Sequence, residues 1–182
     1  MEYWTELYEE ITGKINEHLP QVAWVDLWHE QVNYLTEELP FPTPAVFVAF
    51  STLTTDDRGT LAQDCNTQVD LYLFYETFSD TYAGSANGKG ALDFLRTLTE
   101  LHALFHGKSG RAYSGMRRTD MRREESGGAG NLYRVSFECL VTDYSACHLF
   151  VTTENPDADV RVKPLAGKVP GDTGKPLFDV GR

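Results

Sequence analysis

The segment that most constrains the fold is Asn87–His106, with the sequence NGKGALDFLRTLTELHALFH. Its apolar side chains recur at intervals of three and four residues, which is the spacing of one wide stripe on an α-helix. The predicted stripe consists of Ala91, Leu92, Leu95, Leu98, Leu101, Leu104 and Phe105. A stripe of this width has to pack against other apolar surface, and strand-like segments flank it on both sides. The sequence therefore predicts an amphipathic helix between two β-hairpins.

A second amphipathic helix is predicted over residues 2–18, where Leu7, Ile11 and Ile15 share one face, and Pro20 ends it. Segments rich in β-branched and aromatic residues predict the strands. These strands are expected over 22–31, 45–52, 64–76, 111–125 and 133–141, with a short one over 148–152. The segments 45–52 and 64–76 are predicted to pair as an antiparallel hairpin around a polar turn at 54–60.

This order, α-β-β-β-α-β-β followed by a tail, predicts an α+β fold. We expect a two-layer sandwich in which a mostly antiparallel sheet carries its helices packed on one face. A chain of 182 residues is long enough for one domain with an extension. We predict that the domain spans residues 1–144. Residues 145–182 are predicted to form an extended C-terminal tail, because proline and glycine are frequent there and periodicity is weak.

Composition narrows the class of protein. Hydrophobic residues make up 41% of the chain, which is typical of a globular protein, and no apolar run approaches the roughly 18 residues that span a bilayer. The acidic start of the chain does not resemble a signal peptide, so we expect no membrane association and synthesis in the cytosol. The three cysteines show no CxxC spacing, and Cys139, which lies within a strand-like alternation, is expected to be a small buried residue without redox or metal chemistry.

No motif predicts catalysis, a cofactor or a metal. The loop Gly84–Gly90 has the position of a phosphate-binding loop but lacks its glycine spacing and hydroxyl residue. His102 and His106 have the spacing of a helical metal pair, without the glutamate of an HExxH motif or an evident third ligand. Several serines are present, but none lies in a GxSxG motif. We therefore expect no catalytic, cofactor-binding or metal site.

The most unusual local feature is a basic segment in an acidic chain. The net charge is −11, yet residues 108–134 contain seven Lys or Arg and three acids. The candidate partner interface consists of Arg111, Arg117, Arg118, Arg122 and Arg123. Arginine is enriched in interfaces and pairs well with carboxylates. Two other interpretations stay open: a charged strand edge that prevents aggregation, and direct contact with DNA.

The arrangement of these elements resembles the tail terminator and tail-completion (neck) proteins of long-tailed bacteriophages. Three stretches within residues 45–144 carry the resemblance: TQVDLYLFYE, ALDFLRTLTELHALFH and NLYRVSFECLVTDY. The resemblance implies a structural virion protein that is not an enzyme and needs no cofactor. It implies a homo-hexameric ring at the head-proximal end of the tail tube, which stops tube polymerisation and offers a surface to the head-completion proteins.

The implied partners are other copies of the chain, the tail tube protein and the neck proteins. DNA would pass through the lumen without specific binding, which agrees with the excess of negative charge. The implied location is the tail or neck of the virion, after assembly in the host cytoplasm. Two alternatives remain: a head–tail adaptor or other tail protein of related fold, and a small cytosolic α+β enzyme or ligand-binding domain.

Overall fold

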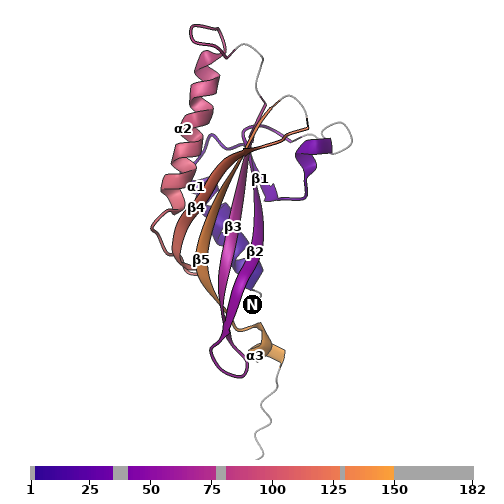
Figure 1. Ribbon diagram of the computed structural model, residues 1–182, viewed down its shortest axis with the longest axis vertical. Helices are drawn as coiled ribbons and strands as arrows, with labels where there is room; N and C mark the ends of the chain where they lie inside the picture. Colours follow the sequence, from indigo (N-terminus) through magenta and orange to yellow (C-terminus); the bar gives the residue numbers. More distant parts are fainter. Residues whose placement is uncertain (1–2, 35–40, 77–80, 128–129, 150–182) are drawn as a thin grey trace, which may run out of the picture. The chain divides into compact units, whose positions relative to one another are not determined.

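The computed structural model describes residues 3–34, 41–76, 81–127 and 130–149. The elements are α1 (Tyr3–His18), β1 (Trp24–Leu27), η1 (Gln31–Tyr34), β2 (Ala45–Asp57), β3 (Gln63–Tyr75), α2 (Gly88–Phe105), β4 (Ser114–Glu124), β5 (Asn131–Asp143) and α3 (Ser145–Leu149). The strands form one five-stranded sheet in the order β1-β2-β3-β5-β4 (Figure 1), and only β1 and β2 are parallel. The predicted α+β class with a mostly antiparallel sheet is therefore confirmed.

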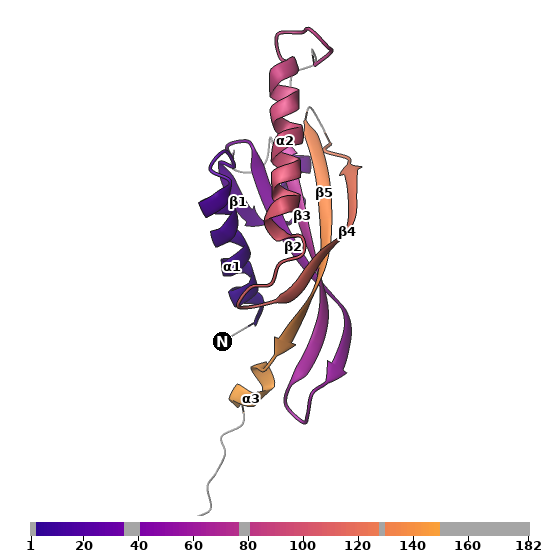
Figure 2. The ribbon, with the colours of Figure 1, turned by 90° about the vertical axis from the view of Figure 1, so that its left-hand side faces the viewer.

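Helices α1 and α2 lie on the same face of the sheet (Figure 2), as predicted. The core between the two layers is apolar, because strand residues alternate between the faces and β2, β3 and β5 turn apolar side chains toward the helices. This core contains Leu7, Ile11 and Ile15 from α1, Leu98, Leu101 and Phe105 from α2, and Val48, Leu71, Val135 and Phe137 from the sheet. Each such side chain contributes about 1.5–3 kcal/mol when fully buried.

The predicted apolar stripe of α2 is wrong in its first half. Leu92 and Leu95 are 61% and 50% exposed, whereas Phe94 and Thr97 are buried in their place. Phe94 lies four residues before Leu98 and seven before Leu101, so it shares their face of the helix, where its ring contacts Tyr133 with the ring centroids 5.5 Å apart. Leu92 and Leu95 lie to the side of this face.

Several predicted strands also differ from the structure in their bounds. The first strand is shortened to β1, because the chain turns into η1 from Gln31 onward. Strand β2 continues to Asp57, through residues predicted to form a turn, because its threonines pair with β3 as far as Asp57 opposite Gln63. Helix α3 covers Ser145–Leu149, where the sequence predicts the start of a short strand. The rest of the predicted tail, from residue 150, lies outside the described residues.

The far end of the β2–β3 hairpin reaches past the layer of helices (Figure 2), and residues 51–60 are all exposed. Polar contacts fix this end to β5. Arg58 lies 3.3 Å from the Asp64 carboxylate, and Thr142 donates a hydrogen bond of 2.7 Å to the same carboxylate. The projecting hairpin is thus held by polar contacts outside the layer formed by α1 and α2.

Neither α1 nor α2 lies on the second face of the sheet (Figure 2). Near β1, a small aromatic cluster covers it, in which Trp28 stacks on Tyr72 with ring centroids 4.1 Å apart and Phe41 meets Phe47 edge-on. Burial and the nearby Asp70 carboxylate raise the pKa of Tyr72 to about 12, so its hydroxyl stays protonated. Toward β4 the same face becomes polar and charged.

Candidate functional site

Strand β4 forms one margin of the sheet and carries four of the five predicted interface arginines. Residues paired across antiparallel strands share a face. Arg117 lies opposite Glu138 and Arg122 opposite Arg134, on the face without helices. Arg118 pairs with Phe137, and Arg123 pairs with Tyr133; both partners face the helices. Two register irregularities in β4 shift the alternation, and the positive charges are divided between both faces of the margin.

The beginning of β4 already has a partner along its outer edge. The Met116 amide donates to the Lys108 carbonyl at 3.0 Å, and the Gly107 amide donates to the Met116 carbonyl at 2.8 Å. The Arg118 amide donates to Nδ1 of His106 at 3.0 Å. Beyond Arg118, no segment of the described chain pairs with the outer edge from Thr119 to Glu124. This six-residue stretch, called the open edge of β4 below, offers unpaired backbone groups.

Glu10 on α1 fixes the loop that leads into β4. Its carboxylate accepts hydrogen bonds from the backbone amides of Arg111, at 3.0 Å, and Ala112, at 2.7 Å, and from Lys14, at 2.6 Å. A Cβ atom on Gly110 would overlap this carboxylate, so the close approach requires glycine. Burial works against the charge of Glu10, but the three hydrogen bonds outweigh it and lower its pKa.

The arginines of β4 differ in how far they are neutralised within the chain. Nε of Arg122 lies 3.0 Å from Glu124 and 3.5 Å from Asp120, and the hydrogen bond to Glu124 is the main cause that raises its pKa. Among the described residues, Arg117 and Arg123 are exposed and form no ion pair. Arg117 and Arg123 are therefore the arginines that have most to gain from an external carboxylate.

The strand beside β4 contains an ionic cluster that the sequence did not predict. Arg134 is 15% exposed at its side chain and lies 3.0 Å from Glu124, 3.8 Å from Asp120 and 4.0 Å from Asp70. Asp70 is only 6% exposed and accepts hydrogen bonds from Ser136 and Gln68. The cluster joins β3, β5 and β4 on the face without helices. The available signal was the acid Asp70, which stands between Val69 and the apolar run that begins at Leu71.

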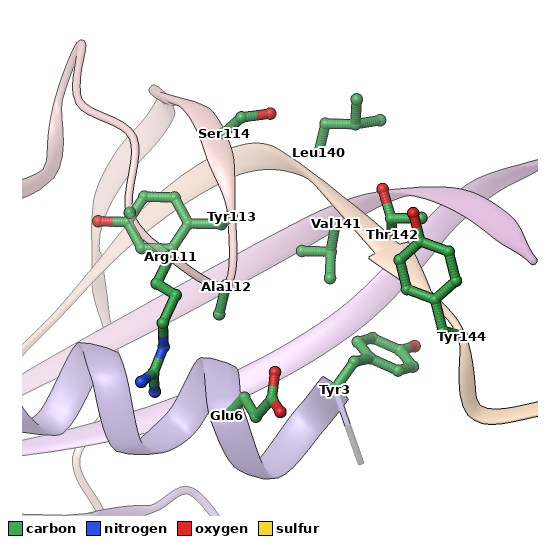
Figure 3. Close-up of a pocket in the computed structure, with 11 residues that line it drawn as sticks. Tyr3, Glu6, Arg111, Ala112, Tyr113, Ser114, Leu140, Val141, Thr142 and Tyr144 are labelled. Atoms are coloured by element: carbon green, nitrogen blue, oxygen red, sulfur yellow. The ribbon is translucent and has the colours of Figure 1, made fainter. Parts of the chain in front are cut away.

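Arg111 is not part of this margin. It lines a groove of about 350 Å³ between the start of α1, the loop before β4 and the end of β5. Figure 3 shows its side chain directed toward α1, on which Glu6 lies, with the rings of Tyr3 and Tyr144 farther along. The structure therefore brings Arg117, Arg118, Arg122 and Arg123 together on one strand and separates Arg111 from them.

Two of the described histidines, His102 and His106, lie next to each other at the C-terminal end of α2. The rings of His102 and His106 lie 4.7 Å apart, and burial, Arg118 and His106 lower the pKa of His102. The described residues contain no group of three or more potential metal ligands. Burial raises the pKa of the Cys139 thiol to about 12, so it is not a nucleophile near neutral pH. Helices that are both long and apolar enough to cross a membrane are not found in the described part of the chain.

The chain was compared with family models, curated proteins and solved structures. No family model matches the chain. No curated protein matches it. Among solved structures, it is similar to a chain from the virion of a native gene transfer agent particle, at 11% sequence identity and a TM-score of 0.34. The match covers 78% of this chain and 92% of the other. A likeness at this level assigns neither a family nor a function.

Proposed function

We propose that this protein is a structural component of a phage-like virion, a tail terminator that caps the tail tube as a ring and joins it to the neck proteins. The proposal rests on one observation in particular: β4 is a firmly anchored marginal strand with an open edge and exposed arginines that have no ion pair among the described residues. Such a margin is suited to contact with another protein, and an acidic copy of the same chain supplies the matching charge.

A firmly held β4 favours binding, because the strand loses less conformational entropy when a partner binds to it. Glu10 holds the loop before β4, and Lys108 and His106 hold the beginning of the strand itself. The Asp70–Arg134 cluster supports the same strand from the face without helices. The open edge is thus presented by a rigid support.

A contact between different surfaces of identical copies closes into a ring when the rotation between the copies allows it. A hexameric ring is what the resemblance to tail terminators implies. With a net charge of −11 on each copy, the ring would repel the phosphate backbone of DNA in its lumen and let it pass without specific binding. The protein therefore acts through shape and contacts, and we propose no enzymatic step.

Electron microscopy of tails assembled with and without the protein tests this function. Tails assembled with the protein should have uniform length and join heads, because the ring stops the tube and presents the neck surface. Without it, tube polymerisation should continue and heads should stay unattached. Tails of unchanged length that join heads normally without the protein would contradict the proposal.

A further inference from the structure

A second free edge lies on the opposite margin of the sheet (Figure 1). Strand β1 covers β2 only from Ala45 to Val48, and the Trp28 amide donates to the Val48 carbonyl at the end of this pairing. From Ala49 to Asp57, no segment of the described chain pairs with the outer side of β2. Residues 51–57 are also exposed at their side chains. This stretch, Ala49–Asp57, is called the free edge of β2 below.

This edge has few of the features that usually protect a marginal strand. Such strands carry lysine, proline or inward charges, or they are very short. The segment Ala49–Thr55 contains no lysine, arginine, proline or acid, and four of its seven residues are Ser or Thr at 51, 52, 54 and 55. Only the bulge at Leu53 interrupts it, and Asp56 and Asp57 follow at its end. An edge of this kind favours pairing with another strand.

The direction of the strands favours a second copy as the partner. In the sheet, β2 is antiparallel to β3, β3 to β5, and β5 to β4, so β2 and β4 run in opposite directions. A rotation about a ring axis along the strands preserves these directions. It therefore brings β4 of one copy against β2 of the next as an antiparallel pair, the more stable kind. The arginines of β4 and the aspartates of β2 have complementary charge.

We infer that the open edge of β4 pairs antiparallel with the free edge of β2 in the next copy, so that the sheets join around the ring. This inference rests on the proposed function, because it names the contact that closes the ring. Each edge carries an exposed apolar side chain that the pairing would cover, Met121 at 44% exposure on β4 and Leu53 at 43% on β2.

Site-specific photo-cross-linking of the full-length protein tests the pairing. A benzophenone amino acid replaces Leu53, and copies labelled with ¹⁴N and ¹⁵N are mixed before irradiation. Mass spectrometry should find cross-links between the two isotopic copies that map to residues 119–124. The same probe at Glu9, which is exposed on α1, is the matched control and should give at least tenfold fewer cross-links to that segment.

Sedimentation of the same samples separates the two proposals. If rings form but the probe at Leu53 reacts with other segments or not at all, the edge pairing is wrong and the terminator function is still supported. Cross-links to residues 119–124, combined with unchanged tails in the absence of the protein, would support the pairing and contradict the function. A chain that stays monomeric at every concentration and gives no cross-links between copies would also overturn the pairing.

Discussion

Single side chains determine how firmly β4 is held. Glu10 gathers two backbone amides and the Lys14 ammonium, and Lys14 also donates to the Tyr113 hydroxyl at 2.9 Å. Both amides belong to the loop before β4, so the position of this loop depends on one carboxylate. Gly110 makes the close approach possible. A single acid on the first helix therefore controls the entry to a strand about a hundred residues later.

Replacing Glu10 with Gln should lower the free energy of unfolding at neutral pH by about 1–3 kcal/mol, because one acceptor oxygen and the charge are removed. The pKa of Glu10 is lowered in the folded protein, so its contribution is complete above its ordinary value of 4.5. This stabilisation disappears as the pH falls through the lower pKa that Glu10 has in the folded protein. Urea unfolding from pH 3 to 7 should show the difference between the two proteins shrinking on acidification.

Glu9→Gln is the control for this prediction, since Glu9 is exposed on the same helix. It should leave the unfolding free energy within about 0.5 kcal/mol of the original protein. An equal decrease from both substitutions would show that the helix responds to charge alone.

The three thiols should differ sharply in reactivity. Cys65 and Cys139 are buried with raised pKa values, whereas Cys147 is exposed. A thiol reagent at pH 8 should modify one cysteine in the native protein and three after denaturation. Cys147→Ser should leave the native protein unmodified. Rapid modification of Cys139 in the native state would show that β5 opens readily.

At the scale of elements, β4 is a margin whose two halves differ. The first half is paired with the segment 106–109, whereas no segment of the described chain pairs with the outer side of the second half. Helix α2 has a related feature, since Leu92 and Leu95 remain exposed beside the buried stripe. Within the described part of the chain, the two-layer core thus leaves the open edge of β4 and a short apolar stripe of α2 uncovered.

Reversing two charges on β4, Arg117→Glu with Arg123→Glu, should weaken self-association at least tenfold while the isolated chain still folds. Both side chains are exposed and form no ion pair among the described residues, so the substitutions cost the fold little. Sedimentation equilibrium measures association and circular dichroism measures folding.

The matched control, Lys89→Glu with Arg96→Glu on α2, makes the same change in net charge away from β4. It should leave association within about twofold of the original protein. Comparable weakening by both variants would point to net charge as the cause and would remove β4 from the interface.

Much of the fold could be predicted from the sequence, because long periodic segments encode it. The stripe of α1 and the alternation of β5 correspond directly to buried positions. The error in α2 concerns Leu92 and Leu95, which were predicted on the buried face although Phe94 has the 3/4 spacing with Leu98 and Leu101. The site was predicted as a set of arginines on one strand. Its support by Asp70 and Arg134 could not be predicted, because the register that joins β3, β5 and β4 is a property of the folded sheet.

For the whole molecule, the prediction of a domain over 1–144 can be tested by truncation. A chain ending at Tyr144 should melt cooperatively within about 4 °C of the full-length protein, since the core cluster lies entirely before that residue. Truncation removes the hydrogen bond from Sγ of Cys147 to the Leu61 carbonyl, which is exposed to solvent. Differential scanning calorimetry measures the transition. Absence of cooperative melting would show that the segment from 145 onward belongs to the domain.

The charge of the whole chain makes assembly sensitive to salt. Copies with a net charge of −11 repel one another at long range, and the arginines of β4 attract acids only at short range. Salt screens both the repulsion and the attraction. The shape of the two sheet edges, and not the net charge, therefore has to determine which surfaces of two copies meet. The two free edges on opposite margins of one sheet supply that geometry.

The most direct test is a cryo-electron microscopy reconstruction of the head-proximal end of the tail, with this protein identified in the density. The account predicts a single closed ring of copies at that end, with β4 of each copy against its neighbour. Density for the protein along the whole tube, or particles that contain none of it, would contradict the account.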